Sequence, residues 1–230
     1  MSINKIYFVE KSFVFNSRDF DSHIIAGSEK TLINISSELS KNANLDIKVF
    51  NLTQNKQIIN NVEWNNIDQI NSYDVPDVLI AMSDANLLSL IKCKKKFLWS
   101  HSVQPLEKFL RKKQLFAFIK NKPIVILEGK YHFETRGFLT SFYGKKILPI
   151  SVDYEFIEAQ VDENLLPEKK AIFTTRPDRN IRLLLACWTK IFEKSKNSSL
   201  YVNPPYNLKK VDIENNVKLR AKGNRADLIK

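Results

Sequence analysis

The sequence predicts an α/β protein built on a parallel sheet, and three observations support this fold class. Short apolar, β-rich runs alternate along the chain with stretches whose apolar residues recur at helical spacing. A strand–helix–strand pattern opens the chain, and a second one lies at 170–206. Hydrophobic residues make up 43% of the chain and there are only 5 glycines, as in a globular α/β protein. We therefore expect a Rossmann-like first domain and the first βαβ part of a second Rossmann-like domain.

The opening pattern contains two strands and one helix. Lys5–Glu10 is the first predicted strand, and a polar loop separates it from Gly27-Ser28-Glu29. A helix is predicted over Lys30–Leu39, where the apolar residues share one face. Asp46–Leu52 is the next predicted strand. The full G-x-G-x-x-G pattern is missing, so a dinucleotide-binding fingerprint is not supported.

The middle of the chain repeats the alternation. The predicted strands are Asp77–Met82, Lys96–Trp99 and Ile124–Leu127, and a short helix is predicted over Asn86–Ile91. One amphipathic helix is predicted over Gln104–Lys122, stopped by Pro123, with these side chains directed inward: Leu106, Phe109, Leu110, Phe116 and Ile119. Ligands of parallel sheets collect at the carboxyl ends of the strands. His101, Gly129 and Lys130 follow such ends.

The last part of the chain begins with a predicted strand, Ala171–Thr175, and a polar turn. A helix follows from Ile181, and the later predicted elements are the strands Leu200–Val202 and Val217–Leu219 and a helix start at Asn224–Lys230. Unpaired N–H groups make the start of such a helix a good anion site. Arg176 and Arg179 lie in the turn before it. The alternative interpretation is that they are two solvated arginines on a loop. Residues 156–170 have the composition of a linker, so we expect domains at 1–165 and 166–230.

Charge and cysteine content restrict the class of protein further. The net charge of +11 indicates an anionic partner such as phosphates, nucleic acid or a lipid surface. The two cysteines lie far apart, without disulfide or metal-site spacing, which favours a reducing compartment. The sequence shows neither a signal peptide nor a long apolar span, so we expect a cytoplasmic protein that does not cross a membrane.

The segment Thr175–Ile181, TRPDRNI, resembles a motif of the group-1 (family 4-like) GT-B glycosyltransferases. One subgroup of that family opens its second domain with a strand, the turn Ser-Arg-Pro-Asp-Arg-Gly-Leu and a Leu-rich helix. Lys146–Asp153 is the next resemblance, because the family often has a strand here followed by a Pro-Asn-Gly-Val-Asp turn. Pro149, Val152 and Asp153 match that turn, with Ile150-Ser151 in place of Asn-Gly. The resemblance covers nearly the whole chain. The family's later two-glutamate segment and its long C-terminal helix are absent, so we expect a truncated second domain.

The resemblance implies a retaining, metal-independent transfer of a sugar from a nucleotide-diphosphate donor to a glycan or lipid-linked acceptor, with no further cofactor. It implies that Arg176 and Arg179 neutralise the leaving diphosphate as charge develops on it. No Asp or Glu beside His101 suggests a triad, and the resemblance implies that His101 orients the donor sugar and is not a general base. Gly27 and Ser28 match a substrate-binding loop, and Gly129 and Lys130 are further candidates for substrate binding.

Two alternatives to an active enzyme remain open at this stage. One is a non-catalytic glycosyltransferase remnant or partner subunit, and the other is a basic nucleic-acid-binding protein, although no helix-turn-helix or zinc-finger pattern is present. Ten cations between Lys92 and Lys122 face only Glu107 as a counter-charge. They predict salt-dependent peripheral contact with anionic membrane lipid. The apolar residues between these cations are interpreted as packing on the sheet.

Overall fold

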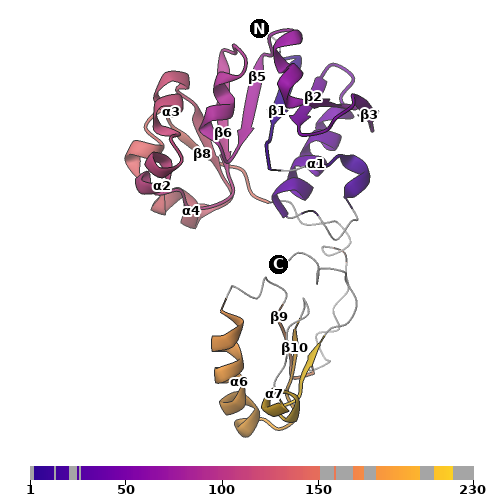
Figure 1. The fold of residues 1–230 in the computed structure, drawn as a ribbon, viewed down its shortest axis with the longest axis vertical. Coiled ribbons are helices and arrows are strands. Elements are labelled where there is room, and N and C mark those ends of the chain that lie inside the picture. The colour runs from indigo at the N-terminus through magenta and orange to yellow at the C-terminus, as the bar shows by residue number, and fades with distance from the viewer. Residues whose placement is uncertain are drawn as a thin grey trace. The chain divides into compact units, whose positions relative to one another are not determined.

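The chain divides into two units, Met1–Asp153 and Tyr154–Lys230, each with its own sheet (Figure 1). The computed structural model describes residues 3–12, 14–20, 25, 27–150, 158, 168–173, 180–202 and 210–219. The predicted domain boundary at 165/166 lies outside these residues. No helix in the described ranges is long and apolar enough to cross a membrane.

Eight strands form the sheet of the first unit: β1 (Lys5–Val9), β2 (Asp46–Asn51), β3 (Gln57–Ile59), β4 (Val62–Asn66), β5 (Val78–Met82), β6 (Lys95–Ser100), β7 (Ile124–Leu127) and β8 (Lys145–Ile147). Their order is β3-β4-β2-β1-β5-β6-β7-β8. Every pair is parallel except β3–β4 at one edge. The predicted α/β class with a parallel sheet is therefore confirmed.

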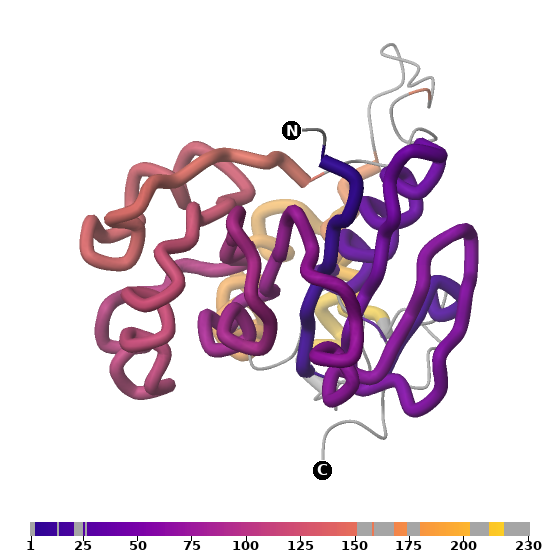
Figure 2. Tube along the Cα trace, turned by 90° about the horizontal axis from the view of Figure 1, so that it is seen from above, coloured from indigo at the N-terminus to yellow at the C-terminus, as the bar shows by residue number. Residues whose placement is uncertain are grey.

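The position of β1 decides where a ligand would bind to such a sheet. The chain moves from β1 to β2 and β4 in one direction, and later from β5 to β8 in the other. Figure 2 shows β1 in indigo, with β2, β3 and β4 on one side of it and β5 to β8 on the other. The order reverses between β1 and β5, and parallel sheets bind ligands at the carboxyl ends of the strands at such a switch point.

Both faces of the sheet are covered, which explains why its central strands read as continuous apolar runs. Helix α1 (Gly27–Ser40) packs on the face that contains Phe8 and Val49. The opposite face, with Tyr7 and Leu79, is covered by the 3₁₀ turns η2 (Ile67–Ser72) and η3 (Ala85–Ser89) and by α2 (Leu106–Arg111) and α3 (Leu115–Asn121). The chain then continues through α4 (Lys130–Thr135) and the 3₁₀ turn η4 (Phe138–Thr140) to β8. A further short 3₁₀ turn, η1, spans Ser17–Asp19.

The prediction of one helix over Gln104–Lys122 is wrong. The helix is interrupted at Lys113, whose φ of 53° is left-handed. Gln114 is buried there, and its Oε1 accepts a hydrogen bond from the backbone N–H of Ala85 at 3.4 Å, which ties the break to η3. The break shifts the phase of the helical pattern. Phe109 and Phe118 are consequently buried, whereas three residues predicted to point inward are exposed: Leu110, Phe116 and Ile119.

Smaller differences concern the edges of the sheet. The sequence analysis did not predict β3 and β4, which are joined by Asn60 and Asn61, both with left-handed φ, as in a tight hairpin turn. The helix predicted over Asn86–Ile91 is the 3₁₀ turn η3. The strand that the resemblance implies before Pro149 is β8, which spans Lys145–Ile147.

The second unit contains the predicted strand–helix–strand pattern in a sheet of its own. Strands β9 (Lys170–Phe173), β10 (Ser199–Val202) and β11 (Val217–Leu219) pair in parallel in the order β11-β10-β9. Helix α6 (Ile181–Lys194) connects β9 to β10, and α7 (Lys210–Glu214) connects β10 to β11. Trp188 is buried among apolar side chains of the sheet and donates its Nε1–H to the carbonyl of Asn215 at 2.9 Å. The predicted helix start at Asn224–Lys230 lies outside the described residues.

Candidate functional site

Polar side chains follow four neighbouring strands of the first unit at the point where each strand ends. Glu10 follows β1, Ser83 follows β5, His101 follows β6 and Glu128 follows β7. Glu29, in the first turn of α1, is coupled to Glu10 through Ser12. Because the switch point lies between β1 and β5, these residues occupy the edge where parallel sheets bind ligands. We call Glu10, Glu29, Ser83, His101 and Glu128 the carboxyl-edge site.

His101 and Glu128 form a pair that the strand register creates. Parallel pairing of β6 with β7 sets Ser100 beside Leu127, so the next residue of each strand points to the same face. His101 Nδ1 contacts Glu128 Oε1, and the side chains are 12% and 15% exposed. A carboxylate on Nδ1 holds the proton there and leaves Nε2 of the neutral ring as an acceptor. No Asp or Glu lies beside His101 in the sequence, and its acidic partner Glu128 comes from the next strand.

Several buried polar atoms near this edge have no hydrogen-bond partner within the described part of the chain. They are Glu10 Oε2, Trp99 Nε1, His101 Nε2 and Gln104 Oε1. The His101 ring lies against Trp99 at a centroid distance of 5.0 Å, so its position is set by packing as well as by Glu128. Buried polar groups are normally paired, and an unpaired one is costly. A ligand hydroxyl at His101 Nε2 would supply the missing partner.

The two carboxylates at the end of β1 have different environments. The backbone N–H of Ser12 donates to Glu10 Oε1 at 2.7 Å, and the Ser12 hydroxyl donates to Glu29 Oε1 at 3.4 Å. Burial raises the pKa of Glu10, the Ser12 hydrogen bonds oppose that rise, and the charge of Glu29 adds to it. Glu10 therefore holds a proton more readily than an ordinary glutamate.

Ser83 has a backbone conformation that a residue with a Cβ rarely adopts. Its φ is 55°. Its N–H donates to the carbonyl of Trp99 at 2.8 Å, and its own carbonyl accepts from Gln104 Nε2 at 3.0 Å. Such left-handed residues cluster at functional sites, where neighbouring structure holds them in place.

On the opposite face of the same edge lie two cations: Arg136, which the sequence analysis did not select, and Lys108, one of the ten cations between Lys92 and Lys122. Arg136 is buried, and it donates to the carbonyl of Thr140 at 3.0 and 3.2 Å and to Ser100 Oγ at 3.2 Å. Burial lowers the pKa of Arg136 to about 10. Burial, together with nearby cations that include Arg136, also lowers the pKa of Lys108. Within the described ranges neither side chain has a carboxylate at ion-pair distance. No motif marks either residue, because their proximity depends on tertiary folding.

The remaining predicted site residues are placed as follows. Gly27 and Ser28 begin α1, where the Ser28 hydroxyl donates to Glu29 Oε2 at 2.9 Å. Gly129 precedes α4 and Lys130 begins it, with Lys130 Nζ exposed 3.7 Å from Glu134 Oε1. A Cβ at either glycine would meet no atom within 4 Å, so packing alone does not require glycine there. Arg176 and Arg179 lie outside the described residues.

Neither metal ligands nor similar proteins assign a further function to this site. Among the described residues, no group of three or more His, Cys, Asp or Glu side chains is arranged to hold a metal ion. No protein-family model matches the sequence, and no curated protein matches it.

Proposed function

We propose that this chain is a nucleotide-sugar-dependent glycosyltransferase of the GT-B type, acting on a glycan or lipid-linked acceptor. The observation that carries the proposal is the placement of His101 at the carboxyl end of β6, fixed by Glu128 and Trp99 and with Nε2 unpaired among the described residues. The Rossmann-like strand order and the resemblance of Thr175–Ile181 to the family's basic turn support the same reaction class.

In this proposal His101 binds the donor sugar. Its Nε2 accepts a hydrogen bond from a sugar hydroxyl, while Glu128 keeps the ring proton on Nδ1. Glu128 is therefore a positioning residue. Arg176 and Arg179 take the role that the resemblance implies, in which fixed cations stabilise the charge that develops on the leaving diphosphate. Retention of anomeric configuration and independence of metal are likewise what the resemblance implies.

Calorimetric titration of the full chain with UDP, GDP, UDP-glucose and GDP-mannose tests the proposal. We expect one base to be preferred, and the sugar nucleotide to bind more tightly than its diphosphate. His101→Ala should remove that gain, which is roughly a factor of 2 to 13 for one net hydrogen bond of 0.5–1.5 kcal/mol. Glu128→Gln should remove part of it. His132→Ala, a histidine of α4, is the matched control. The absence of binding to all four compounds would overturn the proposal.

A further inference from the structure

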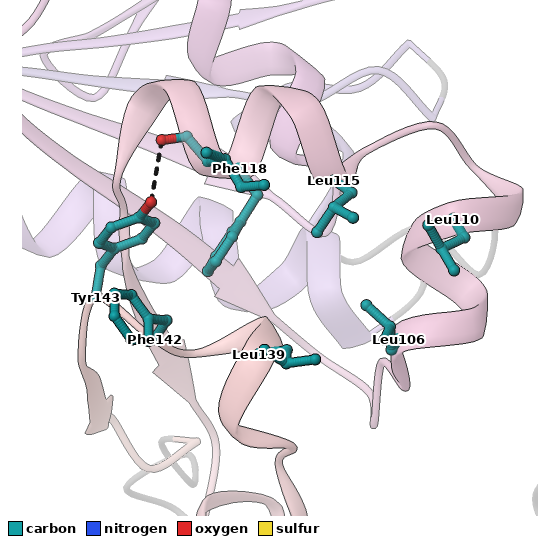
Figure 3. A pocket seen from close by; sticks show the side chains of 8 residues that line it. Leu106, Leu110, Leu115, Phe118, Leu139, Phe142 and Tyr143 are labelled. Carbon is teal, nitrogen blue, oxygen red and sulfur yellow. Dashed lines mark hydrogen bonds between the residues drawn. The ribbon is translucent and has the colours of Figure 1, made fainter.

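An apolar groove opens on the surface of the first unit between α2, α3 and the residues around η4. Its volume is about 240 Å³. Figure 3 shows leucine and aromatic side chains from these elements around it, with Phe118 among them. Tyr143 closes one end, and its hydroxyl donates to the carbonyl of Ile119 at 3.3 Å. This hydrogen bond joins two residues that line the groove, Tyr143 and the α3 residue Ile119.

Large apolar side chains around this groove are exposed. Phe142 lines the groove and is 59% exposed, Phe138 is 70% exposed, and Phe116, next in the chain to the lining residue Leu115, is 77% exposed. Leu110, Ile119 and Leu139 are each more than half exposed beside them. The Phe138 and Phe142 rings contact each other edge to face at 5.2 Å, so part of the patch is already ordered. Several large apolar side chains exposed at and near one groove mark an interaction site. We call this surface the α2–α3–η4 face.

The segment that forms the apolar face is rich in positively charged residues. Between residues 106 and 147 there are ten Lys and Arg against three Glu, which accounts for most of the chain's net charge of +11. Arg111, the last residue of α2, is exposed, as are Lys112 and Lys113 in the turn between α2 and α3. Glu107 lies 3.6 Å from Arg111, in an exposed pair that provides little neutralisation. The face therefore combines an apolar centre with a local excess of positive charge.

We propose that the α2–α3–η4 face docks reversibly on an anionic lipid bilayer. The exposed Phe and Leu side chains enter the boundary between headgroups and acyl chains, and the cations contact the headgroups. Nucleic acid would use the cations but would leave the leucine-lined groove empty. An apolar protein surface would fill the groove but would not neutralise the cations. A bilayer with anionic headgroups would both fill the groove and neutralise the cations. The proposal holds whether or not the chain transfers a sugar.

Vesicle flotation with the full chain tests the proposal. The vesicles contain phosphatidylcholine alone, or equal parts phosphatidylcholine and phosphatidylglycerol, at about 0.05 and about 0.5 M salt. We expect binding to the anionic vesicles at low salt, and weaker binding at high salt. Equal binding to neutral vesicles, or no binding to anionic ones at low salt, would overturn the proposal.

Matched variants separate the two parts of the face. Arg111→Glu/Lys112→Glu/Lys113→Glu should abolish binding, whereas Lys92→Glu/Lys94→Glu/Lys95→Glu, with the same change of charge at the amino end of β6, should largely preserve it. Phe116→Ser/Phe142→Ser should weaken binding at least about tenfold, whereas Ile58→Ser, at a 66% exposed position of β3, should not.

Circular dichroism establishes that each variant is folded. Equal losses in the two lysine series, or binding unchanged by Phe116→Ser/Phe142→Ser, would contradict docking through this face. A combined result with RNA would also contradict the proposal: RNA displaces the protein from anionic vesicles, and Phe116→Ser/Phe142→Ser binds RNA as well as the wild type does. That result would assign the cations to nucleic acid.

Discussion

Glu10, at the end of β1, makes stability depend on pH in an identifiable direction. Its pKa is raised above the ordinary 4.5, first by burial, so the folded state binds more protons than the unfolded state just above that pH. Stability should therefore fall as pH rises from 4.5 through the raised pKa of the folded state.

Replacing Glu10 with glutamine tests this assignment. Glu10→Gln keeps an acceptor for the N–H of Ser12 but cannot ionise. As pH rises, the free energy of unfolding of the variant should therefore increase relative to that of the wild type. The increase is about 1.4 kcal/mol per unit by which the pKa of Glu10 is raised. Urea unfolding across this pH range measures the difference. A wild-type-to-variant difference that stays constant with pH would show that Glu10 does not titrate with a raised pKa.

Ser83 provides a second prediction for a single residue. Its φ of 55° is natural for glycine and unfavourable for a β-branched residue. Ser83→Gly should change the free energy of unfolding by less than about 1 kcal/mol, whereas Ser83→Val should lower it by about 1–3 kcal/mol. Urea unfolding of both variants checks the contrast. Equal effects would indicate that the left-handed conformation is not maintained.

At the scale of elements, an ion-pair network holds β2 against β4. Lys48 Nζ lies 2.9 Å from Glu63 Oε2 and 3.0 Å from Asp46 Oδ1, and Lys56 Nζ lies 3.1 Å from Glu63 Oε1. Burial alone would raise the pKa of Glu63, but the hydrogen bonds from Lys48 and Lys56 outweigh it and lower the pKa. The network thus stabilises the sheet at neutral pH.

Glu63→Gln should destabilise the first unit by about 1–3 kcal/mol at pH 7, between the values for exposed and fully buried pairs. Because the folded-state pKa of Glu63 is lowered, its stabilisation is present above the unfolded value of 4.5 and is lost as pH falls through the folded pKa. The wild type and the variant should therefore converge in acid. The exposed pair Lys41–Glu38 offers a control, because Glu38→Gln should have little effect at any pH.

The break between α2 and α3 predicts opposite roles for two phenylalanines of one short helix. Phe118 is 1% exposed and lies edge to face with Phe109 at 5.5 Å, whereas Phe116 is 77% exposed. Phe118→Ala should cost about 3–5 kcal/mol of stability. Phe116→Ala should cost less than about 0.5 kcal/mol. Chemical denaturation measures the stability lost in each variant. A larger loss for Phe116→Ala than for Phe118→Ala would support the uninterrupted helix predicted from sequence.

At the scale of the whole molecule, the cores that the described residues form in the two units differ in size. The first unit buries two clusters, one on each face of its sheet. The described core of the second unit consists of Ile181, Trp188, Leu200, Val202 and Val217. Small cores bury a smaller fraction of their surface and are less stable. The second unit should therefore unfold at a lower urea concentration.

The three tryptophans report on the two units separately. Trp64 and Trp99 are buried in the first unit and Trp188 in the second. Trp188→Phe should retain a late fluorescence transition in urea. Trp64→Phe/Trp99→Phe should show a fluorescence transition at a lower urea concentration. The wild type should show both transitions by circular dichroism. A single midpoint shared by every variant and probe would mean that the units unfold together.

The sequence by itself determined the class of the fold and the positions of most strands in it. Val78–Met82 and Ile124–Leu127 are short apolar runs between turn residues, and only a sheet buried on both faces accommodates such runs. The position of His101 at a strand end follows from the same local pattern. These features depend on neighbouring residues, so local sequence is sufficient to predict them.

Tertiary structure alone decided which side chains meet. Glu128 reaches His101 across 27 positions because of the register between β6 and β7. Arg136 reaches Ser100 across 36 positions, and Gln114 holds the break before α3 through η3. None of these contacts leaves a periodic signal, because each joins one residue to one distant partner. The phase of α3, and with it the exposed apolar face, follows from such a contact and could not be read from helical spacing.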